Sequence, residues 1–181
     1  MRAALHLFGE RGYDATTVQD ITSAAGVSKG TFFNYFDTKE AILPGIAAHR
    51  LEELETALTP ERGAPSSPVA RIKLALRLMA EDPLCERHLA HQLAAAMMHR
   101  RDIGPHHALR DLLSRQVRQA QELGEIRSDL DPLYVAGVIR ALFFQRIHLW
   151  HQGQRPFPLP QLIDGSVDLL LEGAAGPRWT G

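Results

Sequence analysis

Residues 3–43 read AALHLFGERGYDATTVQDITSAAGVSKGTFFNYFDTKEAIL, and this stretch decides the fold of the first part of the chain. Its apolar and cap-forming residues predict a series of short helices. The first helix should end at Gly12, because glycine readily adopts the left-handed conformation that closes a helix. The second should begin at Thr16 or Thr17, where Thr16 and Gln19 fit the spacing of a capping box.

A turn follows at Ala25-Gly26-Val27, where the glycine permits a backbone that other residues would strain. Ser28 is then placed to cap a short third helix that ends near Tyr35. Two short helices joined in this way form a helix-turn-helix pattern. We expect the pair to pack on the first helix through apolar residues, namely Leu7, Phe8, Val18, Ile21, Ala24, Ala25, Val27, Phe32 and Phe36.

The next segment resembles the start of a longer helix. Asp37 and Glu40 have the spacing of a cap, which predicts a helix from Lys39. Pro44 would interrupt that helix, because proline has no amide hydrogen to donate. We therefore expect a kink or a break there.

The remainder of the chain carries a repeated helix-start signal, in which a capping residue or glycine precedes a proline: Ser67-Pro68, Asp82-Pro83, Gly104-Pro105 and Asp131-Pro132. Gly124 and Gly153 stand where two of the resulting helices should end. The segment 59–68, TPERGAPSSP, is a linker by composition. No segment alternates like a strand, so we predict an all-α fold with helices at about 68–80, 83–101, 105–123, 132–152 and 160–172.

Composition narrows the class of protein. The 181 residues are 45% hydrophobic and 23% charged, with a net charge of −1 and one cysteine. The hydrophobic and charged fractions are typical of a globular protein. The single cysteine excludes an intramolecular disulfide and fits a reducing cytoplasm. The sequence shows neither a membrane-spanning run nor a signal peptide, so we expect no membrane association.

The sequence contains few features that would support catalysis or metal binding. The chain lacks a nucleophile elbow, a phosphate loop and a dinucleotide motif, so we predict neither an enzyme nor a cofactor. Cys85 lies near the start of a predicted helix, and we interpret it as a packing residue rather than a redox sensor. Histidines form two pairs at helical spacing, His88 with His91 and His148 with His151, but neither pair has an obvious third ligand and we predict no metal site.

The residues of 3–43 resemble the N-terminal domain of TetR-family transcriptional regulators. The resemblance lies in Ala-Ala…Phe…Gly-Tyr, in the paired threonines, in Ala-Gly-Val-Ser-x-Gly-Thr and in Tyr-Phe…Lys-Glu. It implies a three-helix DNA-binding domain at residues 1–45, followed by a helical bundle at 46–181 that binds a ligand and dimerises.

The resemblance also implies a role for individual residues, with the third helix in the major groove. Thr17, Lys39 and Tyr35 would contact phosphates, and Asn34 would read a base, since an asparagine can pair with adenine. The groove edge would be approached by Ser28, Lys29, Gly30 and Thr31. Family members usually carry tyrosine at the position of Phe33 and a basic arm where this chain has only Arg2. Both differences predict weaker DNA binding.

Basic and acidic residues are equal in number within the first 50 residues, so one protomer would neutralise few phosphates. We therefore expect a homodimer that binds a palindromic operator.

The segment 132–152 is apolar on more than one face, through Val135, Val138, Ile139, Leu142, Phe143, Ile147 and Trp150. Together with the last helix it would form the four-helix dimer interface that the resemblance implies. The last helix would contribute Leu162, Ile163, Val167, Leu170 and Leu171. The alternative is a central core helix of a monomer.

The bundle should also hold a small, largely apolar effector. Met97, Phe143 and Phe144 are the candidate lining residues, since flexible and aromatic side chains suit such pockets. We therefore predict a ligand-responsive regulator, and the resemblance to the family implies a repressor. The alternative is a helical ligand-binding or scaffold dimer that does not recognise an operator.

Overall fold

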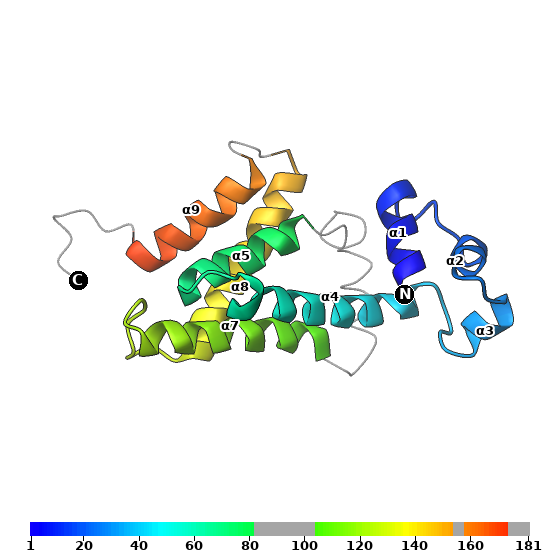
Figure 1. Cartoon of the computed structure of the whole chain (residues 1–181). Helices are drawn as coiled ribbons and strands as arrows, with labels where there is room; N and C mark the ends of the chain where they lie inside the picture. The colour runs from blue at the N-terminus through cyan, green and yellow to red at the C-terminus, as the bar shows by residue number, and fades with distance from the viewer. Residues whose placement is uncertain (82–103, 154–157, 174–181) are drawn as a thin grey trace. The chain divides into compact units, whose positions relative to one another are not determined.

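The computed structural model describes residues 1–81, 104–153 and 158–173, and all the regular elements among them are helices (Figure 1). The prediction of an all-α fold is thereby confirmed. One compact unit contains residues 1–53, and a second contains residues 54–80 and the described residues from 108 onward. The predicted helix at 83–101, with Cys85, His88, His91 and Met97, lies outside the described residues.

The N-terminal unit contains α1 (Arg2–Arg11), α2 (Val18–Ala25) and α3 (Lys29–Phe33), with α2 in contact with both of its neighbours. Two glycines end helices as predicted. Gly12 has φ 81° after α1, and Gly26 has φ 67° and ψ 30° after α2. The left-handed backbone at Gly26 turns the chain into α3, which confirms the helix-turn-helix.

Aromatic and branched residues fill the core of this unit. Phe8, Ile21 and Phe32 are buried, and the rings of Phe8 and Tyr13 lie 5.0 Å apart. The half-buried residues Val18 and Phe36 pack against this core. The prediction was wrong for Val27, which is 43% exposed, and for Ala24 and Ala25. These three residues lie at the end of α2 and in the turn after it, where they are exposed to solvent.

The predicted cap of α2 is displaced by one residue. Thr17, rather than Thr16, is the N-cap, and its partner is Asp20 rather than Gln19. Thr16 cannot cap because it is buried, and its hydroxyl donates to the carbonyl of Gly12 at 2.8 Å. A tertiary contact with the end of α1 thus decides between two adjacent threonines.

The start of α4 (Leu43–Ala57) also differs from the prediction. A 3-10 turn, η1 (Glu40–Ile42), precedes it, and the hydroxyl of Thr38 accepts a bond from the Ala41 amide at 3.3 Å. Pro44 is therefore the second residue of α4 and not an internal residue. A proline in the first turn removes no helical hydrogen bond, so Pro44 does not kink α4; the run that follows Lys39 instead changes from a 3-10 turn to an α-helix at Leu43.

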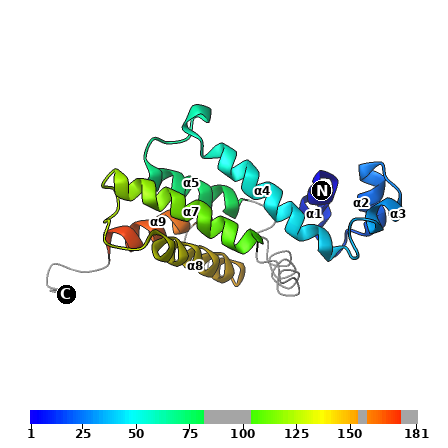
Figure 2. The ribbon, with the colours of Figure 1, turned by 90° about the horizontal axis from the view of Figure 1, so that it is seen from below.

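The second unit contains η2 (Pro60–Arg62), α5 (Pro68–Ala80), α7 (Gly104–Glu122) from Ala108 onward, α8 (Pro132–His151) and α9 (Leu159–Glu172). The predicted caps are confirmed at Ser67, whose hydroxyl accepts from the Ala70 amide at 3.1 Å, and at Asp131, which accepts from the Leu133 amide at 2.6 Å. Helix α9 packs against both α5 and α8 (Figure 2).

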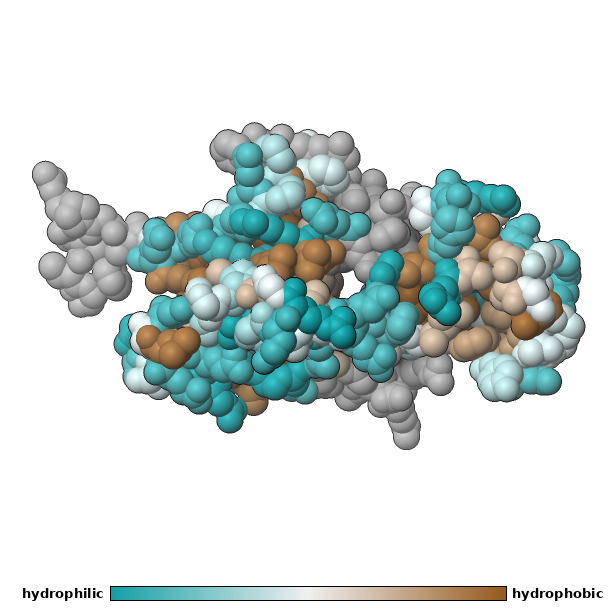
Figure 3. Space-filling view, viewed as in Figure 1, coloured by the Kyte–Doolittle hydropathy of each residue, from teal (hydrophilic) through white to brown (hydrophobic). Residues whose placement is uncertain are grey.

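Apolar and ionic contacts hold these helices together. Hydrophobic residues gather in a band over α5 and the neighbouring helices, between more hydrophilic surfaces (Figure 3). Two carboxylates of α9 form ion pairs with α5, Asp164 with Arg77 and Asp168 with Lys73. On the α8 side, the Nε atom of Arg146 donates to the Ser166 hydroxyl at 2.9 Å. These contacts fix α9 against the rest of the bundle.

Candidate DNA-binding interface

The third helix presents one polar face to solvent. Ser28 caps it by accepting a bond from the Thr31 amide at 3.0 Å, and the two hydroxyls lie 2.9 Å apart. Phe32 points into the core and holds the helix in place. The exposed residues include all six that the sequence assigned to this segment: Ser28, Lys29, Gly30, Thr31, Asn34 and Tyr35. A short helix anchored by one aromatic side chain and exposed elsewhere is suited to insertion into a groove.

Thr17 lies at the exposed N-terminus of α2, inside a closed capping box. Its amide donates to the Oδ2 atom of Asp20 at 2.8 Å, and its hydroxyl accepts from the Asp20 amide at 3.2 Å. Hydrogen bonds from the Thr17 hydroxyl and amide lower the pKa of Asp20. The carboxylate therefore stays ionised beside the predicted phosphate contact, and a phosphate would have to compete with it for the same donors.

Lys39 is half-buried and already has protein partners. Its ammonium donates to the carbonyls of Tyr13 at 2.9 Å and of Thr16 at 3.0 Å. The Nζ atom also lies 4.0 Å from the centroid of the Tyr13 ring. An ammonium has three donors, so two hold the segment between α1 and α2, and the remaining one could reach a phosphate.

The same tyrosine connects this segment to the start of α4. Its hydroxyl donates to the Oε1 atom of Glu40 at 2.9 Å. Burial, together with this bond to a carboxylate, raises the pKa of Tyr13 well above its ordinary value. Burial also opposes ionisation of Glu40, but hydrogen bonds from its own amide, Tyr13 and Thr38 outweigh it and lower the pKa of Glu40. Tyr13 and Glu40 are positioning residues that sequence reasoning missed.

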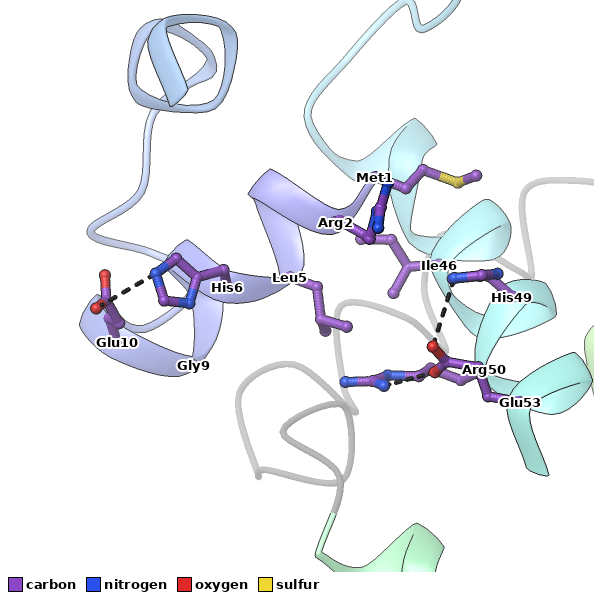
Figure 4. Close-up of a pocket in the computed structure, with 10 residues that line it drawn as sticks. All are labelled: Met1, Arg2, Leu5, His6, Gly9, Glu10, Ile46, His49, Arg50 and Glu53. Atoms are coloured by element: carbon purple, nitrogen blue, oxygen red, sulfur yellow. Dashed lines mark hydrogen bonds and ion pairs between the residues drawn. The ribbon is translucent and has the colours of Figure 1, made fainter. Parts of the chain in front are cut away.

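A pocket of about 410 Å³ lies between α1 and α4 within the same unit (Figure 4). Leu5 and Ile46 extend from the two helices into this space, and polar side chains such as His6 and Glu10, which lie 3.4 Å apart, line it. Gly45 lies close to the first residue, since a Cβ atom there would be 2.9 Å from the Met1 sulfur. The sequence did not predict this pocket, because its two walls come from distant segments.

Of the predicted effector residues, the structure places two. Phe143 is buried in the bundle, whereas the adjacent Phe144 is 40% exposed, and their rings meet edge to face at 5.3 Å. One faces the core and the other the surface, so the structure does not bring both to one cavity. Met97 is outside the described residues.

Arg71 is a buried polar hub in the bundle that the sequence did not suggest. Its guanidinium donates to the carbonyls of Pro65 and Ser66, each at 2.9 Å. It also donates to the side-chain oxygens of Gln116 at 2.7 Å and Gln119 at 2.6 Å. Pro65 and Ser66 lie in the linker, and the two glutamines lie in α7. Arg71 therefore fixes the linker to α7.

The predicted dimer residues divide into buried and accessible ones. In α8, Val135, Ile139, Phe143 and Ile147 are buried within the protomer, as are Ile163 and Val167 of α9. The apolar residues of these two helices that are not buried include Val138, Leu142, Leu162 and Leu169, which we call the α8/α9 outer face. The first three are half-buried, and Leu169, which the sequence analysis omitted, is 52% exposed.

Known proteins similar to this chain include regulators with an N-terminal helix-turn-helix. The model of the family described as "Bacterial regulatory proteins, tetR family" matches residues 1–46. The chain is 29% identical over 172 residues to the HTH-type transcriptional repressor DhaR of Mycobacterium sp. (strain GP1), which covers 91% of this chain and 87% of that protein. Residues 1–46 therefore form a domain of the TetR type.

Two further comparisons support the TetR assignment. A 62-residue stretch is 36% identical to the HTH-type regulator YvdT of Bacillus subtilis, covering 32% of each protein. The structure also resembles FadR of Thermus thermophilus, a TetR-family repressor solved in complex with lauroyl-CoA. That match has a TM-score of 0.67 and 27% identity, and it covers 99% of this chain and 97% of FadR.

Two negative findings concern the residues that the structure describes. Within them, no three His, Cys, Asp or Glu side chains are grouped to hold a metal ion, and His148 instead lies 2.8 Å from the amide nitrogen of Gln152. None of the described helices has the length and apolar character that crossing a bilayer requires.

Proposed function

We propose that this protein is a ligand-responsive transcriptional repressor that binds a palindromic operator as a homodimer and is released by a small, largely apolar effector. It would act in the cytoplasm, where the operator is. The observation that carries the proposal is the exposed face of α3 within a TetR-type domain. Lys29 in this helix and Asn34 directly after it would supply a cation and a base-reading amide.

Contacts in this interface divide into two kinds. Phosphate contacts from Thr17, Tyr35 and Lys39 would position the domain, and Asn34 would pair with adenine. Ser28, Lys29, Gly30 and Thr31 would lie along the groove edge, where Gly30 has no side chain to obstruct approach. Since one domain carries few cations, two domains on one site would supply the phosphate neutralisation that useful affinity needs.

Dimerisation would use the α8/α9 outer face. Leu169 is 52% exposed, and an exposed leucine in such a face is favourable when a partner covers it. Leu169→Glu should therefore convert the dimer to a monomer in light scattering after gel filtration. Leu123→Glu is the matched control, because Leu123 is 67% exposed and directly follows α7, so it belongs to neither helix of this face. Equal masses for the two variants would contradict the proposed interface.

The effector would bind the bundle and stabilise a conformer with low operator affinity. By linkage, it can shift the population only through a difference in its affinity for the two conformers. The lauroyl-CoA complex of the Thermus thermophilus relative makes an acyl thioester the first candidate. Addition of lauroyl-CoA should then lower operator affinity, with free coenzyme A as the control for binding that does not require the acyl chain.

The decisive experiment is selection from a random duplex pool, followed by fluorescence anisotropy on the selected and a scrambled duplex at two salt concentrations. The proposal expects enrichment of a palindrome and binding that weakens with salt, since each neutralised phosphate adds about 0.9 to the slope of log affinity against log salt. Asn34→Ala should reduce the preference for the selected duplex. Equal, weak binding to both duplexes would favour the alternative, a ligand-binding or scaffold dimer without an operator.

A further inference from the structure

We propose that Phe33 is a specificity-determining residue, whose ring contacts the 5-methyl group of a thymine in the operator. The inference rests on the proposed function, since it requires that α3 enters the major groove. It concerns a residue that cannot make the phosphate hydrogen bond expected of tyrosine at this position.

Phe33 is the last residue of α3 and is 48% exposed. Its ring is held edge to face against Phe32, with centroids 5.4 Å apart and planes at 85°. Phe32 is itself only 5% exposed, so the support is a fixed part of the core. A large apolar ring is therefore oriented by the core and presented to solvent.

The ring shares a face with the residues assigned to the groove. Lys29 and Gly30 precede Phe33 by four and three positions, a spacing that places side chains on one side of a helix. Gly30 contributes no side chain there, and a Cβ atom added to it would meet only the Ser28 hydroxyl, at 3.6 Å. Hydrophobic surface is visible among hydrophilic residues in the region of α2 and α3 (Figure 3). The ring is thus accessible to a flat partner.

The chemistry of the major groove selects that partner. A phenyl ring has no polar hydrogen to donate to a phosphate or a base edge. Among the base-pair edges in that groove, the apolar group is the thymine methyl. Asn34, the next residue, pairs best with adenine. Phe33 and Asn34 together would favour A·T pairs at neighbouring positions of each half-site.

The test uses the duplex that the wild-type protein selects from a random pool. Each thymine of the half-site is replaced in turn by deoxyuridine, which removes only the methyl group, and affinity is measured by anisotropy. For one thymine, symmetric replacement in both half-sites should weaken wild-type binding about 15-fold, since a buried methyl contributes about fourfold per site. Phe33→Ala should bind the thymine and uracil duplexes equally.

Tyr35→Phe serves as the control, and Phe33→Leu is a second variant at the tested position. Tyr35→Phe removes only a hydroxyl from a residue that is 79% exposed. It should lower affinity for both duplexes alike and keep the 15-fold uracil effect. Phe33→Leu retains an apolar group of shorter reach and should show a smaller effect.

The outcomes separate two failures. If the wild-type protein selects no sequence, the proposed function fails and this inference falls with it. If it selects a palindrome but no thymine is sensitive to uracil, or if Phe33→Ala keeps the same sensitivity, only the role of Phe33 is overturned. Packing of the ring on a deoxyribose would give that second result.

Discussion

Lys39→Met separates the structural role of this lysine from its proposed phosphate contact. Methionine retains much of the aliphatic stem but removes the ammonium, which donates to the carbonyls of Tyr13 and Thr16 and lies over the Tyr13 ring. A hydrogen bond from a charged donor contributes about 1.5 kcal/mol at the low end of its range, which suits a half-buried group. Two such bonds and a weak cation–π contact give a loss of roughly 3 kcal/mol.

Urea unfolding followed by circular dichroism measures this loss, at one protein concentration throughout. With a slope of about 1–3 kcal/mol per molar urea, the midpoint should fall by at least about 1 M. Hydrogen exchange should show the loss of protection around residues 13–16. Lys29→Met is the matched control, because Lys29 is exposed and should lose DNA affinity without losing stability. If Lys39→Met unfolded at the wild-type midpoint, the proposed clamp on this segment would be refuted.

Three further changes test the N-terminal unit. Thr17→Ala removes the capping hydroxyl and should cost about 1 kcal/mol in the free energy of unfolding; an unchanged urea midpoint would contradict the assigned cap. Gly26→Ala places a Cβ atom on a left-handed backbone and should cost about 1–2 kcal/mol in the same assay, whereas no loss would mean that the turn relaxes. Burial raises the pKa of Tyr13 above its ordinary value of 10.0, so the folded state holds this proton more tightly than the unfolded chain. Its contribution to stability is complete below about pH 10 and declines as the pH rises further, and Tyr13→Phe should reduce that decline in unfolding experiments across this range.

Local signals predicted most of the helical framework. Ser67 and Asp131 cap their helices as expected, and Gly12 and Gly26 end theirs. These predictions succeed because a cap depends on the residue type and on backbone groups two or three positions away. Thr16 shows the limit of the method, because its burial against the end of α1 depends on a contact that local spacing cannot reveal.

Residues whose roles depend on distant partners were the ones that sequence reasoning missed or described incompletely. Lys39 was recognised as a cation, but its bonds to carbonyls 23 and 26 positions away were not predictable. Arg71 was overlooked because its glutamine partners lie 45 and 48 positions along the chain. Phe143 was proposed on composition alone, and its burial depends on how α8 packs. The exposed residues of α3 were identified because a family motif placed them.

Sequence-selective DNA binding through α3 is the central claim, and the ratio of dissociation constants for a scrambled and a selected palindromic duplex tests it most directly. The account predicts a ratio of about 1,000 or more for the wild-type protein, in the usual range for specific DNA-binding proteins. It also predicts two protomers per site and a clear reduction of the ratio in Asn34→Ala. A ratio near one for the wild-type protein at both salt concentrations would contradict the claim.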